Sequence, residues 1–277
     1  MPLYENQRAH LIYCLRFQEY ADVHRRFQGG CKLNRFRLVS ALLLLFGLAV
    51  TRASATPSST FWTPCVIDIQ PAGITHLGID NYYKVGSGEA FPTDIGPEWG
   101  ANINSKISLE YGVDLLANQK DPLLFNAKFG YREGVLGKNA PALQIGLFDF
   151  GTNTKASATT PRTDYNVVYL VTGKTLPDGK TRIHAAGYYG NPGALVNGDG
   201  KTENTGWMLA FDRQLCKSGK WVLAGDYASG KKYIGGGGVG VYYYFTKDIS
   251  LLTGPVWFND KTINGDMKWT TQLDINF

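Results

Sequence analysis

The sequence predicts an all-β fold, a transmembrane antiparallel up-and-down β-barrel of twelve strands, on three observations. Apolar and polar residues alternate in segments of about ten residues, the length that a tilted membrane-spanning strand requires. Gly, Asn, Asp, Pro and Lys separate these segments, as turns do. The chain also ends on such a segment, with the aromatic Phe277 as its last residue. Because side chains alternate between the two faces of a strand, each segment has one apolar and one polar face.

Residues 1–55 have the three parts of a secretory signal. A basic region precedes the apolar residues 41–50, and Ala53 and Ala55 supply the small residues of a cleavage site. The apolar run is about half of the roughly 20 residues that span a bilayer, so a single anchor helix is the weaker alternative. We expect cleavage after Ala55. Residues 1–30 are polar and unpatterned, so we expect translation to begin after them.

Positive charge is concentrated in this leader. Residues 1–55 hold eight of the 28 Lys and Arg and three of the 23 Asp and Glu, which leaves 20 of each in the mature chain. The mature chain therefore gives no reason to expect nucleic acid as a partner. Its two cysteines, Cys65 and Cys216, would reach an oxidising compartment, where a disulfide is possible. Two inert free thiols are the favoured interpretation.

Twelve segments match the strand pattern. They are residues 73–85, 95–103, 106–117, 123–132, 141–150, 165–174, 182–190, 204–215, 219–229, 235–245, 249–259 and 267–277. In the last segment Leu273 and Ile275 share the apolar face, and Gln272 lies on the polar one. Odd-numbered residues are the apolar ones in most segments, whereas 165–174 and 249–259 are ambiguous.

Alternation would also suit a water-soluble sandwich, but three details favour a membrane barrel. The segments have spanning length, their number is even, and aromatic residues gather near their ends, as in the girdles of outer-membrane barrels. A closed barrel also satisfies every backbone polar group in lipid. The aromatic residues near segment ends are Tyr83, Trp99, Trp207, Trp221, Trp257 and Trp269.

The connections agree with a barrel over residues 72–277 that has both termini in the periplasm. The connections at 104–105 and 216–218 are short, as periplasmic turns are. Residues 151–164 and 191–203 are longer and rich in Gly, Asn and Thr, so we expect them to be outer loops.

The closing segment resembles the C-terminal signal that the barrel-assembly machinery of Gram-negative bacteria reads in outer-membrane proteins. The matching residues are Trp269, Leu273, Ile275 and Phe277. The resemblance implies insertion in the bacterial outer membrane, with that machinery and the outer-membrane lipids as partners.

The start of the mature chain, residues 56–71, looks like that of an uncharacterised family of predicted outer-membrane proteins, in which an extended segment leads into a first strand like residues 76–82. The resemblance includes residues 126–128 and 141–143, although Cys65 stands where a small hydroxyl residue is expected. It implies a porin-like barrel preceded by a periplasmic lead-in at 56–71. It implies no activity.

Polar side chains on the even-numbered face would line the lumen. The candidates are His76, Asp80, Lys84, Glu98, Glu110, Asp114, Lys128, Arg132, Arg182, His184, Asp212 and Asp226. When 106–117 is folded against 123–132 about residue 120, Lys128 falls diagonally between Glu110 and Asp114, and Arg132 falls beside Glu110.

A charged lumen has two interpretations. The leading one is a porin-like channel for passive diffusion of small polar solutes, which such charges would select. The alternative is a structural or adhesive barrel whose packed lumen is inert and whose outer loops act. Barrels of about eight strands are filled and those of about sixteen hold a channel, so twelve strands leave both possible.

A lipid-modifying enzyme is the weakest hypothesis. Hydrolysis needs a nucleophile, a base and an orienting group within hydrogen-bond reach. The mature chain has two histidines, His76 and His184, and neither shows the His-x-Ser pattern that outer-membrane lipases share. The Gly-rich residues 235–240 run into a strand rather than a helix, which argues against nucleotide binding. We therefore expect no enzyme activity, no metal and no cofactor.

Overall fold

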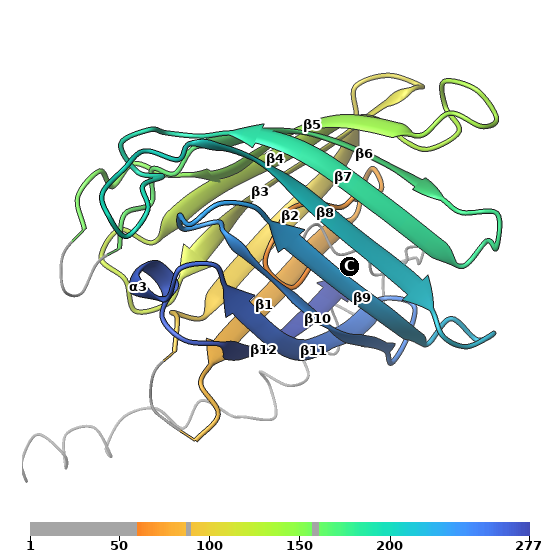
Figure 1. Cartoon of the computed structure of the whole chain (residues 1–277). Coiled ribbons are helices and arrows are strands. Elements are labelled where there is room, and N and C mark those ends of the chain that lie inside the picture. The colour runs from red at the N-terminus through yellow and green to blue at the C-terminus, as the bar shows by residue number, and fades with distance from the viewer. Residues whose placement is uncertain (1–59, 87–89, 157–160) are drawn as a thin grey trace, which may run out of the picture. The chain divides into compact units, whose positions relative to one another are not determined.

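The structure is a computed structural model, and it describes residues 60–86, 90–156 and 161–277 (Figure 1). The predicted leader at 1–55, its cleavage site at Ala53 and Ala55, and the proposed later start lie outside the described residues. Among the described residues, no helix is long and apolar enough to cross a membrane.

The described chain forms a closed barrel of twelve strands, in which each strand is antiparallel to its neighbours in sequence and β1 pairs with β12 (Figure 1). This confirms the predicted fold class and strand number. A short helix, α3 (Lys261–Asn264), lies in the loop before the last strand. The strands are β1 (Thr75–Tyr83), β2 (Asp94–Asn102), β3 (Ile107–Leu116), β4 (Leu123–Tyr131), β5 (Ala142–Phe150), β6 (Val167–Thr175), β7 (Thr181–Tyr189), β8 (Thr205–Gln214), β9 (Trp221–Ala228), β10 (Gly236–Tyr244), β11 (Ile249–Phe258) and β12 (Lys268–Asn276).

The two faces of the sheet follow residue parity, with one reversal. In β12 the even-numbered residues are buried inside the barrel and the odd-numbered ones face outward. In β6 the odd-numbered Val167, Tyr169 and Val171 are buried, whereas Leu170 is exposed. The reversal follows an irregularity in β5, where the register with β4 shifts and Asp149 takes a positive φ of 54°. An extra residue in a strand exchanges the faces of the residues that follow it, which explains the ambiguous pattern over 165–174. The exchange is confined to the end of β5 and to β6, because even-numbered residues such as His184 and Ala186 face inward again in β7.

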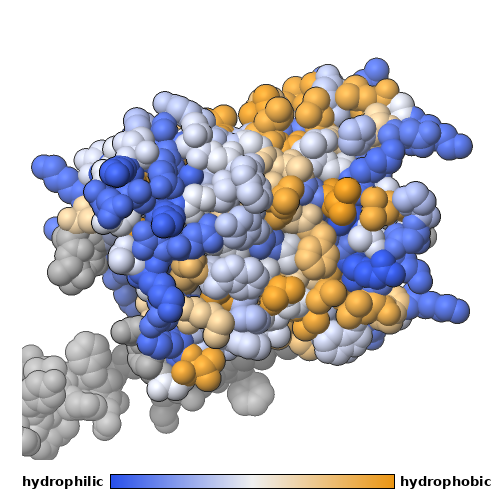
Figure 2. Space-filling model, in the orientation of Figure 1, coloured by the Kyte–Doolittle hydropathy of each residue, from blue (hydrophilic) through white to orange (hydrophobic). Residues whose placement is uncertain are grey.

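The outer surface of the barrel is apolar along the strands and carries aromatic residues near both ends. Figure 2 shows apolar residues gathered over the strands on the side away from α3, and hydrophilic residues around the loops near α3. Two neighbouring pairs illustrate the aromatic rims: Trp207 packs against Tyr227 near the loop end, and Trp221 packs against Tyr243 near the turn end. Such girdles mark the two membrane–water interfaces of a spanning barrel.

The two ends of the barrel differ in their connections. Both chain ends of the barrel meet at the end with the shorter turns, where the backbone N–H of Phe277 donates to the Thr75 carbonyl at 2.8 Å. We call this the turn end, and the opposite end, which carries the loops 151–166 and 190–204, the loop end. The predicted asymmetry of turns and loops is therefore present.

Residues 60–74, which we call the lumen segment, lie inside the barrel over 60–70 and lead into β1 through an exposed turn at 72–73. Phe61, Cys65 and Val66 are fully buried or nearly so, and the side chain of Phe61 fills the space left by Gly238 and Gly240. The prediction of a lead-in at 56–71 that stays in the periplasm is therefore wrong for the described residues 60–71. The physical reason is that this stretch is too apolar to remain in water when an apolar barrel interior is available.

Candidate functional site

The lumen segment separates two cavities inside the barrel. Trp62 and Pro64 line one cavity of about 280 Å³. Thr60, Val66 and Asp68 line another of about 690 Å³ at the turn end. We call the first the acidic cavity and the second the turn-end cavity, and together they are the candidate site.

The acidic cavity is walled by β12, β1, β2, β3, β4 and β5 and by loop residues. Carboxyl side chains outnumber basic ones on its surface. The acids are Asp80, Asp94, Glu98, Glu110, Asp114, Asp149 and Asp274, and the bases are His76, Lys128 and Arg162. All seven acids lie on strands, so the barrel wall holds them in place.

Two of the acids have basic partners within the cavity. The Lys128 ammonium lies 3.5 Å from Glu110, and both side chains are almost completely buried. His76 lies 3.5 Å from Asp274 and also contacts Asn276 at 2.7 Å. At the rim, Arg162 pairs at 2.8 Å with Asp164, which lies outside the lining.

The register between β3 and β4 corrects one prediction. Lys128 lies directly opposite Glu110, rather than diagonally between Glu110 and Asp114, because the hairpin is centred on residue 119 instead of 120, which shifts the pairing by two residues. Arg132 was expected beside Glu110, but its recorded hydrogen bonds in the described chain go elsewhere. Its guanidinium donates to the carbonyl oxygens of Ile69 and Gln70 in the lumen segment, at 3.2 and 3.4 Å.

Several carboxyl groups face each other without an intervening base. Asp80 on β1 is directly opposite Asp94 on β2, and like charges in that position repel. The carboxylate of Asp114 lies over Gly96, where any side chain would overlap with it. Asp149, 3% exposed, completes the set on β5. No group of three His, Cys, Asp or Glu residues in the described chain converges tightly enough to hold a metal ion.

Aromatic rings form the loop-end part of the acidic cavity. Trp62 stacks on Phe91 with ring centres 5.7 Å apart, and Tyr165 stacks on Tyr233 at 3.9 Å with nearly parallel planes. The Lys268 ammonium lies 4.4 Å from the centre of the Phe91 ring, within the range of a cation–π contact.

Asp226 anchors the start of the lumen segment. Its carboxylate accepts hydrogen bonds from the Thr60 hydroxyl and from the backbone N–H groups of Trp62 and Thr63, the last two at 2.8 and 2.6 Å. A fourth comes from the Gly238 N–H at 2.9 Å. Hydrogen bonds to a carboxylate are stronger than neutral ones, so one wall residue fixes one end of the segment.

A second anchor holds the middle of the segment near the turn end. Arg182 makes a two-pronged contact with Asp68, with both N–O distances 2.8 Å, and also donates to Asp212 at 2.9 Å. His184 contacts Asp212 Oδ2 at 3.0 Å. Gln144 adds a bond of 2.7 Å to the Ile67 carbonyl. These wall residues therefore bind the segment rather than line an open pore.

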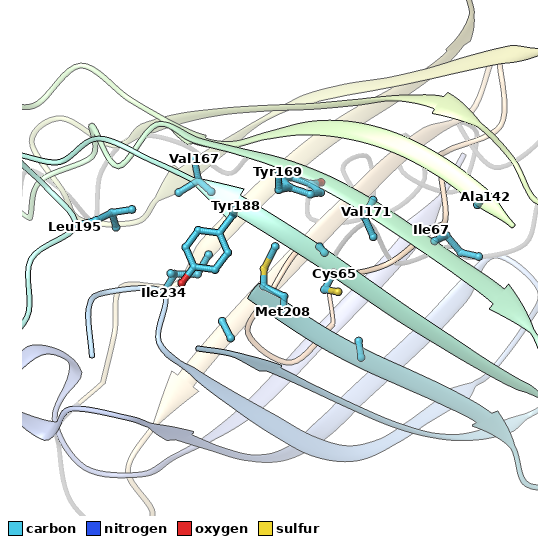
Figure 3. Close-up of a cluster of buried hydrophobic side chains, with 13 residues drawn as sticks. Cys65, Ile67, Ala142, Val167, Tyr169, Val171, Tyr188, Leu195, Met208 and Ile234 are labelled. Carbon is cyan, nitrogen blue, oxygen red and sulfur yellow. The ribbon is translucent and has the colours of Figure 1, made fainter. Parts of the chain in front are cut away.

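One side of the lumen is filled with apolar side chains. Cys65 and Ile67 of the lumen segment pack there against Tyr169, Tyr188 and Met208 from the wall (Figure 3). We call this the filled side. Its other members are Ala142, Val167, Val171, Ala186, Leu195, Ala210, Ala228 and Ile234.

The turn-end cavity carries the opposite balance of charge. Lys180, Lys220 and Lys247 line it, together with residues of the second anchor. Cys216 lies in the neighbouring turn as a free thiol, and Cys65 is free and buried on the filled side, so the two cysteines form no disulfide. The Ser218 hydroxyl is the main cause that lowers the pKa of the Cys216 thiol.

One predicted lumen residue lies elsewhere. Lys84 follows the end of β1 at the loop end and contacts Asp266 at 3.3 Å. Lys261 and Lys84 together hold the pKa of the Asp266 carboxyl below its usual range. The even number of Lys84 predicted an inward side chain, but β1 ends at Tyr83, so the alternation of faces no longer applies at Lys84.

Sequence reasoning missed two of the acids and the aromatic rings. Asp94 is even-numbered and would have followed from parity, had the second strand been started one residue earlier. Asp149 follows the β5 irregularity and has the wrong parity for an inward residue. Trp62 was missed because its segment was placed outside the barrel.

No protein-family model and no curated protein matches the chain. Among solved structures, an outer membrane channel from Pseudomonas putida F1 is 12% identical, with a TM-score of 0.46 over 76% of this chain and 98% of that one. The NanC porin is 8% identical, with a TM-score of 0.46 over 73% and 98%. OmpF from Salmonella typhi is 10% identical, with a TM-score of 0.37 over 74% and 96%. The likeness concerns the fold, so we argue function from the geometry of this chain.

Three features meet in this geometry: a closed sheet, an apolar exterior with aromatic rims, and charged cavities inside. In lipid, a closed sheet leaves no backbone hydrogen-bonding group unsatisfied. The outward apolar side chains can contact the lipid tails. The described chain therefore has the architecture of a transmembrane β-barrel.

Proposed function

We propose that this chain is an outer-membrane channel for passive diffusion of small polar solutes, exported through its cleaved leader. The observation that supports this most directly is the pair of charged cavities inside a closed barrel, one on each side of the lumen segment. A barrel with a purely structural role has no need for interior charges that cost desolvation energy.

In this proposal the lumen segment forms the constriction. Its residues line both cavities, so a solute that passes from one to the other must move past the segment. The anchors at Asp226 on β9 and Arg182 on β7 hold it from the same part of the wall, at two points along the segment. The charged residues beside the segment, among them Lys128 and Glu110, would then determine which solutes pass.

The exterior supports the location and the mode of assembly. Leu273, Ile275 and Phe277 face outward at the turn end, with Trp269 at the other end of β12. We propose that the barrel-assembly machinery reads these residues, and that outer-membrane lipids cover the same face.

The filled side favours a second candidate, a structural or adhesive barrel. Thirteen buried side chains close that part of the lumen, and the lumen segment is hydrogen-bonded to the wall at its start and in its middle. An enzyme has less support, because His184 contacts Asp212, which also accepts from Arg182, as part of the segment's anchor.

Planar bilayer recordings separate the two candidates. Protein purified from outer membranes should produce stepwise conductance in potassium chloride, whereas a heat-unfolded sample should not. If folded protein, verified by its heat-modifiable migration in gels, gives no conductance, the channel proposal fails and the structural barrel remains.

A further inference from the structure

We propose that the acidic cavity is a binding site for small organic cations with two separated amino groups, such as a diamine. The inference deepens the proposed function and rests on it, since a solute reaches the cavity only if the lumen is open to the loop end. It names the class of solute that would bind in the acidic cavity while passing through the channel.

The first support is a surplus of carboxyl groups. Glu110 and Asp274 have their partners in Lys128 and His76. In the described chain, no ion pair joins Lys, Arg or His to the carboxyl groups of four further acids on this surface. These are Asp80, Asp94, Asp114 and Asp149. Several carboxylates in a confined space repel one another, and a bound cation would relieve that repulsion.

The second support is the lack of hydrogen-bond partners at two of these groups. One carboxylate oxygen of Asp94 is buried and has no hydrogen-bond partner in the described residues. Asp149 is 3% exposed, and no described group donates to its carboxylate. Buried polar groups in native proteins almost always have a partner, and the Asp94 oxygen has none. Both residues line the cavity. A ligand with N–H donors would satisfy them.

The arrangement favours an extended organic cation over a metal ion. The acids are spread over β1, β2, β3 and β5, and no three of them converge to coordinate one ion. Two amino groups joined by a short chain can reach carboxylates on separate strands. The cavity volume of about 280 Å³ lies at the small end of ligand pockets, which suits a compact molecule.

The aromatic part of the cavity fits the same class of ligand. Trp62, Tyr82, Phe91 and Tyr233 supply ring faces, which attract ammonium groups. The Lys268 ammonium over Phe91 shows that this wall already accommodates one cation. An alkyl chain between two amino groups would also lose contact with water against these rings, which adds apolar burial to the electrostatic attraction.

Calorimetry on detergent-solubilised protein tests the site without requiring conductance. 1,4-Diaminobutane should bind saturably, whereas 1,4-butanediol, of equal length and uncharged, and succinate, of opposite charge, should not. Replacing both unpartnered acids, Asp94→Asn with Asp149→Asn, should weaken diamine binding at least about ten-fold, because two charge contacts are lost. Asp199→Asn, an exposed loop acid, is the matched control and should bind as the unchanged protein does.

The outcomes separate the inference from the proposed function. Absence of saturable diamine binding, equal binding of the diol, or unchanged affinity in the double variant would each overturn the site, whatever the conductance. Diamine binding without conductance would overturn the channel and leave the site. If the double variant does not fold, Asp94→Asn alone provides the same comparison with a smaller expected loss.

Discussion

The two sides of the lumen are built on the same strand geometry but carry opposite chemistry. On the acidic side, inward positions of β1, β2 and β3 hold Asp, Glu and Gly. On the filled side, inward positions of β6, β7 and β8 hold Val, Tyr, Ala and Met. The lumen segment lies between them and presents Cys65 and Ile67 to the filled side and Trp62 to the acidic cavity.

This difference assigns separate tasks to the two sides. Apolar burial on the filled side stabilises the fold, since each buried apolar side chain contributes roughly 1.5–3 kcal/mol. The acidic side opposes folding where acids such as Asp80 and Asp94 face each other. Functional sites are where proteins tolerate arrangements that cost stability, and the opposed acids are such an arrangement.

Removal of residues 60–70 should have the largest effect. Without the lumen segment the acidic and turn-end cavities would join, so single-channel conductance should rise several-fold. The truncated barrel should also be less stable, because Asp226 and Arg182 lose their partners inside the protein. Planar bilayer recordings and urea unfolding measure the two effects.

A weaker version of this change tests the role of the anchor. Asp226→Asn keeps the segment but removes the charge that holds Thr60, Trp62 and Thr63. It should give intermittent transitions to a higher conductance level. Equal conductance in the truncated, substituted and unchanged proteins would show that the segment is not the constriction.

Met208→Ala on the filled side should affect stability and leave conduction alone. Met208 is fully buried against the apolar cluster, so its truncation leaves a cavity and should cost about 2–5 kcal/mol of unfolding free energy. Because Met208 itself lines neither the acidic nor the turn-end cavity, conductance and ion preference should be unchanged. A changed ion preference would mean that the two sides are coupled through the segment.

Much of the fold could be predicted from sequence because strand alternation is local. The twelve strands agree with the predicted segments to within a few residues at each end. Alternation failed at β6, where Val168 and Val167 are both apolar and only the irregularity at Asp149 decides which faces inward. Such an irregularity depends on tertiary pairing and leaves no pattern in the sequence.

The site could be predicted less well, for a physical reason. The inward acids follow from parity, but which of them bind the segment depends on where that segment lies. Asp226, Arg182 and Arg132 were predicted as lumen residues, and the structure shows them holding residues 60–70. The apolar content of 61–69 was the available signal: a stretch with Phe, Val and two Ile residues needs a buried place.

The smallest effect concerns two inward glycines, of which Gly238 lies against the lumen segment and Gly78 lines the acidic cavity. A methyl group at Gly238 would collide with Phe61, whereas one at Gly78 would meet no atom closer than 3.8 Å. Gly238→Ala should therefore cost about 1–3 kcal/mol of unfolding free energy through overpacking. Gly78→Ala, the matched control, should stay within about 0.5 kcal/mol.

The contribution of the segment to this cost can be isolated by a double-mutant cycle with the truncation of residues 60–70. Once Phe61 is absent, most of the Gly238→Ala cost should disappear, because the remaining close contact is the Pro255 carbonyl at 3.0 Å. Urea unfolding of the four proteins measures the coupling. If Gly238→Ala costs as much in the truncated barrel as in the full chain, the wall rather than the segment requires this glycine, and the close packing of Phe61 is not what fixes the segment in the lumen.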